Sequence, residues 1–395
     1  MGNVGAYCNT PLQLKNSKYM SSTNSLKIAF LFSSGISIPA GMPCNQNITT
    51  RILSGANDRV AKFLERLKFE IDKYYHYKPE PRTNYEDLYY VASQIADSEL
   101  HEIPNPAVQS LIDKILPDIK QLFISKKNEK RLDLNNLVWE TTNYIEDVVC
   151  QLLSSNPNSI DYLHFIKEAC EYNLMASMNI FTLNHDKILE QFLTKNGIQF
   201  TDGFGEPIDN VRRWNPNLFE SELYKIRLFK LHGSIDWFRL WPVEGGNWNN
   251  EFIGIPINWK FSRQFTKNQP SSILYEKADG RPKILVGTFN KMLNYLTDIF
   301  TALFCLFYYH LSNAQRLVIC GYGFGDQGIN TRIIQWFYSS PDHKITIIHP
   351  APEKLKRAAR GAISNKWDEW ISQNRLIILP KRIQEITWSD ICATV

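Results

Sequence analysis

The sequence predicts an α/β protein in which a Rossmann-like parallel sheet carries helices on both faces and a large helical domain is inserted. Four short apolar runs, each followed by helix-like sequence, predict buried parallel strands. They span residues 26–32, 178–184, 316–322 and 344–350. Far more helical sequence separates the first two runs than one crossover connection needs, which predicts the inserted domain.

The insertion is expected over residues 45–175. Its helical periodicity is strongest in 58–75, 84–100 and 159–174. Further strands are plausible at 226–234, 283–288 and 375–380. Residues 26–44 and 176–395 would then form the sheet-bearing domain. Within it, the stretch 236–282 is rich in Trp, Gly and Asn but has little periodicity, so we expect loops or a small subdomain over the sheet's edge.

Other features of the whole sequence indicate the cellular compartment of the protein. Residues 1–25 are polar, with no basic region leading into an apolar run, so a secretory signal is not expected. The longest apolar run, 299–311, is too short to span a bilayer and predicts a buried helix. The seven cysteines are never spaced C-x-x-C, which argues against a disulfide framework or a zinc ribbon. We therefore expect a cytoplasmic protein.

The charge distribution argues against nucleic acid as a direct partner. The net charge is only +4 for 395 residues. The basic clusters at 126–131 and 354–360 are short, and such clusters are more often solvated helix faces than nucleic-acid patches.

The first strand runs into a glycine turn, Ser33-Ser34-Gly35-Ile36-Ser37. Gly35 would let a phosphate approach closely, and the N–H groups that follow would form an anion site. A purely structural loop is an equal alternative. Because ligands of open parallel sheets bind beyond the carboxyl ends of the strands, every later strand end is a candidate for the same site.

Two polar residues mark the end of the second strand. Asn184 is a common type of helix N-cap, and Asp186 in a first helical turn would favour the helix dipole. Both residues equally suit the recognition of ribose hydroxyl groups.

A histidine and a glycine-rich turn follow two later strands. His232 precedes Gly233 at a strand end, where it is either structural or a general base near neutral pH. Gly321, Gly323 and Gly325 follow the 316–322 run and would allow a nucleotide to approach the backbone, with Asp326 as helix cap or ribose ligand.

Taken in order, these motifs resemble the sirtuin family, and more specifically its bacterial sirtuin-like branch of NAD-hydrolysing proteins in anti-phage defence. The resemblance covers roughly 26–45, 176–236 and 283–350. The family pattern G-A-G-x-S-x-x-A-G-x-P is matched by Gly35, Ser37, Ala40, Gly41 and Pro43; T-x-N-x-D by Thr182, Asn184 and Asp186; and H-G-S/T by His232, Gly233 and Ser234.

The departures from the family are specific. Ser33 replaces the first glycine, and Leu183 and His185 stand where protein-deacylating sirtuins carry glutamine and isoleucine. Residues 44–46 lack the acidic-aromatic-arginine character of those enzymes. No cysteine lies between His232 and Cys305, so the family's four-cysteine zinc module is not expected. The resemblance therefore implies that NAD is used without an acyl-lysine peptide, with water as nucleophile.

The resemblance implies an NAD⁺ glycohydrolase that releases nicotinamide and ADP-ribose, with no cofactor beyond NAD as substrate. His232 would be the base, Asn184 would position the water and ribose, and Asp186 would lie at the nicotinamide side. The residues expected to bind the dinucleotide are Ser34, Gly35, Ser37, Gly41, Thr182, Gly233, Ser234, Gly321, Gly323, Asp326 and His349.

An enzyme that destroys NAD⁺ would harm its own cell, so the resemblance also implies control. We expect a homo-oligomer, with the insertion as assembly surface, and a separate partner such as a HerA-type hexameric ATPase or a short Argonaute. Two alternatives stay open: an NAD-dependent protein deacylase or ADP-ribosyltransferase, and a non-catalytic module that senses NAD or ADP-ribose.

Overall fold

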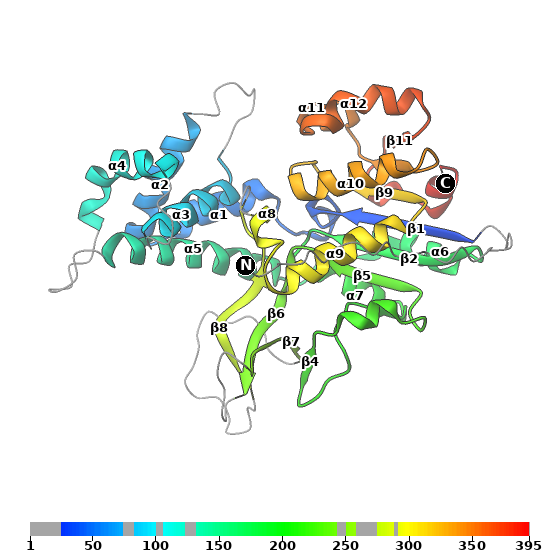
Figure 1. The fold of residues 1–395 in the computed structure, drawn as a ribbon, viewed down its shortest axis with the longest axis horizontal. Coiled ribbons are helices and arrows are strands. Elements are labelled where there is room, and N and C mark those ends of the chain that lie inside the picture. Colours follow the sequence, from blue (N-terminus) through cyan, green and yellow to red (C-terminus); the bar gives the residue numbers. More distant parts are fainter. Residues whose placement is uncertain are drawn as a thin grey trace, which may run out of the picture.

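A computed structural model describes residues 25–73, 83–99, 106–122, 132–242, 250–257, 275–287 and 291–394, so the polar segment 1–25 lies almost entirely outside the described residues. Seven parallel strands form the central sheet in the order β11-β10-β9-β1-β2-β5-β3 (Figure 1). Their bounds are β1 (Leu26–Phe32), β2 (Met175–Thr182), β3 (Phe200–Thr201), β5 (Ile226–Lys230), β9 (Arg316–Cys320), β10 (Lys344–Ile348) and β11 (Leu376–Leu379). The predicted Rossmann-like sheet is confirmed.

The strand order places a topological switch point beside β1. The chain adds β2 and β5 on one side of β1 and later adds β9, β10 and β11 on the other. Apart from the short edge strand β3, this is the doubly wound order of dinucleotide-binding folds, whose ligands lie outside the carboxyl ends of the strands at the switch point. In this chain the switch point lies between β1 and β9.

Helices cover both faces of the sheet because the central strands are apolar on both sides. In β1, Ala29 and Leu31 join one core and Phe30 and Phe32 join the other, as the alternation of a strand requires. The first core is closed by α9 (Asp298–Ser312), α10 (Gln327–Ser339) and α12 (Gly361–Ser372), and the second by α6 (His164–Glu171), α7 (Ile188–Lys195) and α13 (Trp388–Cys392). The short helix α11 (Pro352–Ala358) contacts α12.

The helical insertion has a core of its own. The helices α1 (Asn45–Gly55), α2 (Asp58–Asp72), α3 (Tyr85–Glu99), α4 (Pro106–Ile119) and α5 (Leu132–Leu153) share one hydrophobic cluster. They form a block beside the sheet, at the left of Figure 1. The helix α6 lies within the expected insertion 45–175 but packs under the sheet, where Phe165 contacts Phe30 and Phe32. The separate core of the insertion therefore ends with α5.

The stretch 236–282 takes part in a second sheet. Its antiparallel order is β4-β7-β6-β8, from β4 (Val211–Arg213), β6 (Gly233–Pro242), β7 (Phe252–Pro256) and β8 (Tyr275–Ile284). In the chain, β4 comes before β5 and β6 follows shortly after β5, so the predicted strand at 226–234 is divided between β5 of the parallel sheet and the start of β6. The predicted strand at 283–288 overlaps only the end of β8, in the antiparallel sheet. Among the described residues, no helix is long and apolar enough to cross a membrane.

Candidate active site

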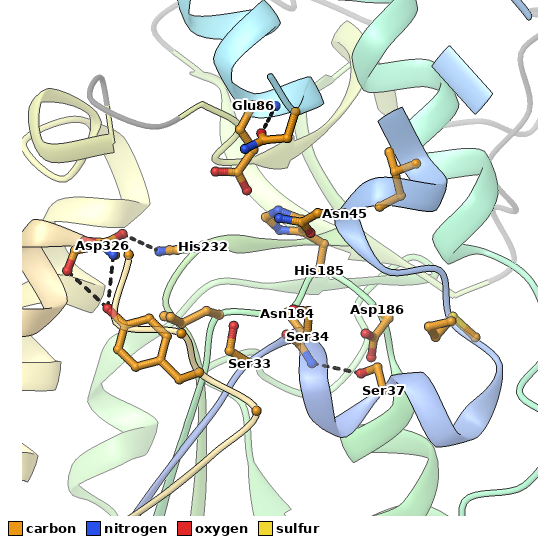
Figure 2. Close-up of a pocket in the computed structure, with 18 of the residues that line it drawn as sticks. Ser33, Ser34, Ser37, Asn45, Glu86, Asn184, His185, Asp186, His232 and Asp326 are labelled. Carbon is orange, nitrogen blue, oxygen red and sulfur yellow. Dashed lines mark hydrogen bonds and ion pairs between the residues drawn. The ribbon is translucent and has the colours of Figure 1, made fainter. Parts of the chain in front are cut away.

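A cavity of about 370 Å³ lies at the switch point. It is lined by residues from the loops after β1, β2, β5 and β9, together with residues of the helical insertion. Eight of the predicted site residues line it: Ser34, Ser37, Asn184, Asp186, His232, Gly321, Gly323 and Asp326. The carboxyl ends of four strands, far apart in sequence, thus bring their polar residues to one place (Figure 2).

Asn184 is held by the first loop and does not cap a helix. Its Nδ2 donates to Ser37 Oγ at 2.8 Å, and its backbone N–H donates to Thr182 Oγ1 at 3.1 Å. The N-cap of α7 is Lys187. Asn184, Ser37 and Thr182 are all buried. The hydrogen bond to Ser37 therefore orients the Asn184 carboxamide, and the bond to Thr182 holds its backbone.

Asp186 is fixed by a turn and by a buried lysine. Its Oδ1 accepts the backbone N–H of Ile188 at 3.1 Å, and its carbonyl accepts a hydrogen bond from Lys230 Nζ. Lys230 is buried and forms an ion pair with Glu190 at 2.8 Å. A paired ammonium on β5 therefore holds the loop that carries both Asn184 and Asp186.

His232 contacts a tyrosine and a carboxylate that are distant in sequence. Its Nε2 lies 2.6 Å from the hydroxyl of Tyr295 and 3.2 Å from Asp326 Oδ2. The Tyr295 hydroxyl donates to the same carboxylate oxygen at 2.9 Å. Since an ionised Asp326 only accepts, Nε2 carries the proton and Nδ1 of His232 remains the basic nitrogen.

The charges around this cluster favour a neutral imidazole. Burial lowers the pKa of His232 below its usual value; the charge of Lys291 acts in the same direction, while Asp326 partly offsets both. Burial opposes ionisation of Asp326, but His232, Lys291 and the N–H of Ile329 hold the pKa of its carboxyl well below the usual range. Burial and the Asp326 charge raise the pKa of Tyr295 well above its usual value, so it stays protonated.

Asp326 connects the start of α10 with His232. It caps α10 by accepting from Ile329 N at 3.1 Å, as one of its expected roles requires. Its other oxygen lies beside His232, so Asp326 lines the first cavity and not the neighbouring one at β10. Sequence spacing gives no indication of this pairing, because the two residues follow different strands of the sheet.

Two predicted glycines touch each other at the switch point. The Gly35 N–H donates to the Gly321 carbonyl at 3.1 Å. A Cβ built on Gly35 would lie 2.5 Å from Gly321 Cα, whereas a Cβ on Gly323 would meet nothing within 4 Å. Gly35 and Gly321 therefore lock the loops after β1 and β9 together, and Gly323 borders open space in the cavity.

Four other predicted residues support the loops from behind the cavity wall. Gly233 has φ +81°, and a Cβ there would lie 2.0 Å from the Lys283 carbonyl oxygen. Ser234 Oγ donates to Asp236 Oδ1 at 2.6 Å. Gly41 has φ +90° and packs against Asn158, and Thr182 orients Asn184 as described. None of these four lines the cavity.

A second cavity of about 540 Å³ adjoins the first. The two share the wall formed by Ser34, Gly321, Tyr322 and Gly323. The second cavity lies at the ends of β9 and β10 and contains His349, whose Nδ1 accepts the N–H of Ala351 at 3.0 Å. The two cavities together give an elongated site across the switch point.

The insertion supplies residues that the motifs do not indicate. Glu86 of α3 forms an ion pair with Lys291 at 3.0 Å, and both line the first cavity.

His185, between Asn184 and Asp186 in the sequence, also lines the first cavity. Nothing in the periodicity of the insertion marks Glu86, but His185 stands at a departure from the sirtuin pattern and could have been singled out there.

In the part of the chain that the structure describes, no group of three or more His, Cys, Asp or Glu residues could hold a metal ion. The described cysteines at positions 44, 150, 170, 305, 320 and 392 are free.

Comparison with known proteins supports the assignment of the motifs. Residues 178–368 match the family model described as SIR2-like domain, a little under half of the chain. This range contains the motifs around Asn184, His232 and Asp326 but not the first turn. The predicted resemblance is therefore confirmed at the level of a SIR2-like domain. A search of curated proteins finds no significant match.

Solved structures of Sir2 proteins are similar at low identity. One is a Sir2 homolog–NAD complex, with 11% identity and a TM-score of 0.39 over 93% of this chain and 88% of that one. A second is a Sir2 homologue mutant–ADP ribose complex, with 9% identity and a TM-score of 0.40 over 93% and 91%. A third is Sir2 bound to acetylated peptide, with 10% identity and a TM-score of 0.38 over 91% and 90%. Because these similarities are weak, the assignment of the fold rests on the order of the strands in the parallel sheet.

Proposed function

We propose that the chain hydrolyses the N-glycosidic bond of NAD⁺ to nicotinamide and ADP-ribose. The observation that carries this proposal is the convergence of Asn184, Asp186 and a neutral His232 on one cavity at the switch point of a doubly wound sheet. The match of residues 178–368 to a SIR2-like domain supports NAD as the substrate.

In the proposed reaction the bond between the ribose C1′ and the pyridinium nitrogen breaks. Its electron pair goes to the nitrogen, so nicotinamide leaves neutral and the ribose gains oxocarbenium character. Water forms the new C–O bond and gives its proton to His232 Nδ1, directly or through a ribose hydroxyl. The resulting imidazolium is stabilised by Asp326, whose carboxylate lies 3.2 Å from Nε2.

The rest of the substrate would occupy the elongated site. Asn184, fixed by Ser37 and Thr182, would position the ribose and the water, and Asp186 would lie at the nicotinamide side. The turn after β1, with Ser34 and Ser37, would face the pyrophosphate. Gly323 and His349 would line the adenosine end in the second cavity.

We take water, and not an acyl-lysine side chain, as the nucleophile in a cavity whose wall the insertion helps to form. Side chains of α1, α3 and α5, among them Asn45, Glu86 and Leu153, line the cavity that holds His232. The ion pair between Glu86 and Lys291 joins this wall to the sheet-bearing domain. The absence from the sequence of the four-cysteine module of deacylating sirtuins supports the same choice.

The proposed biological role is that of an abortive-infection effector in anti-phage defence. It rests on the resemblance of the motifs to sirtuin-like NAD-hydrolysing proteins. Depletion of NAD⁺ would then require control, by a homo-oligomer built through the insertion and by a separate partner in the cytoplasm. A HerA-type hexameric ATPase or a short Argonaute is the proposed partner class.

The test is nicotinamide release from NAD⁺, measured chromatographically with and without the product of the neighbouring gene. We expect Asn184→Ala and His232→Ala each to lower the rate by about 10²–10⁴-fold, the range typical of general acid–base groups. Wild-type rates in both variants would overturn the assignment. Nicotinamide release that requires an acylated peptide would identify a deacylase instead.

A further inference from the structure

His185 is a buried polar side chain that the proposed roles leave unused. It is 8% exposed and lines the same cavity as His232. Its Nδ1 is buried and has no hydrogen-bond partner among the described residues. A buried imidazole nitrogen without a partner is destabilising, and such groups in native structures call for a functional explanation.

The main chain fixes the position of His185. Its carbonyl accepts the Ile235 N–H at 3.1 Å and lies 3.4 Å from the Ser234 hydroxyl oxygen. Ser234 and Ile235 lie on β6, directly after His232, so the main chain holds the two histidines side by side. In the view of Figure 2, His185 lies between His232 and Asp186 and below Glu86.

The distance between the two imidazoles matches one bridging water. Their ring centroids are 6.3 Å apart with an angle of 36° between the planes. Two hydrogen bonds of about 2.8 Å that meet at a water oxygen span about 4.6 Å between nitrogens, which is compatible with this centroid separation. A direct hydrogen bond between the rings is not present.

The charges nearby keep His185 able to accept a hydrogen bond. Burial lowers its pKa well below the usual value, and the neighbouring His232, Lys291 and Lys230 act in the same direction, with only the Gly233 backbone opposing them. His185 is therefore neutral at physiological pH and carries one donor and one acceptor nitrogen.

We infer that His185 is a further catalytic residue, which together with His232 holds the attacking water. The inference rests on the proposed NAD⁺ hydrolysis and deepens it. His185 stays neutral and accepts a hydrogen bond from one O–H of the water. As the water oxygen bonds to C1′, His232 accepts the proton of the second O–H. The electron pair of the broken C1′–N bond passes to nicotinamide. His185 thereby favours water over the return of nicotinamide.

The test measures how the cleaved intermediate partitions. Labelled nicotinamide and unlabelled NAD⁺ are incubated with the full-length chain, and incorporation of label into NAD⁺ is compared with formation of ADP-ribose. We expect His185→Phe to lower hydrolysis about 10–100-fold and to raise the ratio of exchange to hydrolysis by a similar factor, because water is misplaced while bond cleavage is intact. ADP-ribose binding, measured by calorimetry, should change little.

The matched control is His349→Phe, the same substitution in the second cavity. The His349→Phe substitution should change the KM for NAD⁺ without changing the ratio of exchange to hydrolysis. If His185→Phe does not fold, His185→Asn serves as the second variant. An unchanged ratio of exchange to hydrolysis in the His185 variant, with or without slower hydrolysis, would overturn the role given to His185 but not the proposed NAD⁺ hydrolysis. A wild-type chain with no NAD⁺ turnover under any partner condition would overturn the proposed function, and this inference with it.

Discussion

At the scale of single residues, the environment of His232 determines how activity should depend on pH. The base must be neutral, and burial together with Lys291 lowers the pKa of His232 below about 6.5. The rate of NAD⁺ hydrolysis should therefore be constant through neutral pH and fall only as the pH drops through that lowered pKa. A pH profile of kcat/KM measures this directly; a rate still rising above pH of about 8 would contradict it.

Two substitutions should move the acid limb of that profile in opposite directions. Asp326 raises the pKa of His232 and Lys291 lowers it, so Asp326→Asn should shift the limb to lower pH and Lys291→Gln to higher pH. Asp326→Asn should also lower kcat, by up to about 10⁴-fold, because the imidazole loses the carboxylate that orients it and stabilises its protonated form. Shifts in the same direction would show that another group controls the limb.

Residue-scale prediction from sequence succeeded where strand ends decide position. Asn184, Asp186 and His232 each follow a buried strand, and the edge of a parallel sheet brings such residues together. Tyr295 and Lys291 follow no strand of the parallel sheet, and Asp326 meets His232 only through the strand order. No local pattern contains that information.

At the scale of elements, the contact between the turns after β1 and β9 should be important for stability. An alanine at Gly35 would place its Cβ 2.5 Å from Gly321 Cα. Because Gly321 Cα belongs to the backbone and cannot rotate away from the added Cβ, we expect Gly35→Ala to lower the free energy of unfolding by at least about 1–3 kcal/mol, the usual result of overpacking. Urea denaturation checks this.

Gly323→Ala is the control for that experiment. A Cβ there meets nothing within 4 Å, so its effect on the free energy of unfolding should stay below about 1 kcal/mol. Because the added methyl enters the cavity, we expect weaker NAD⁺ binding without loss of stability. Equal destabilisation by both variants would contradict the separation of the two glycines into a structural and a cavity-lining role.

At the element scale, the sequence indicates least where strand pairing is non-local. Loops or a small subdomain were expected over 236–282, and the sequence does not show that this stretch forms an antiparallel sheet with β4. The strands β6, β7 and β8 pair with one another and with β4 across long sequence separations, so little local periodicity marks them. The helix α6 is amphipathic like the helices of the insertion, and its contacts with β1, β2 and α13 assign it to the sheet. Periodicity predicts the helix but not its partner.

At the scale of the whole molecule, the helical insertion and the sheet-bearing domain meet at the cavity. The insertion has a core of its own, yet Asn45, Glu86 and Leu153 line the cavity with residues of the sheet-bearing domain. Ligand binding should therefore slow amide hydrogen exchange in α1 and α3 as well as in the loops after β1 and β9. Exchange measured with ADP-ribose tests this, and protection confined to the loops would contradict it.

The overall architecture was predictable because its signals are local and strong. Four continuous apolar runs predicted a parallel sheet, and the excess of helical sequence after the first run predicted an inserted helical domain. The placement of the insertion over the cavity was not predictable, because it depends on contacts such as Glu86 with Lys291.

The central claim is that this cavity cleaves NAD⁺ with water and needs no acyl-lysine substrate. The most direct measurement is a product analysis of NAD⁺ incubated with the purified chain and its partner, in the absence of any peptide. The account predicts nicotinamide and ADP-ribose in equal amounts, and both formed about 10²–10⁴-fold more slowly with His232→Ala. Intact NAD⁺ under these conditions, with turnover only when an acylated peptide is added, would contradict it.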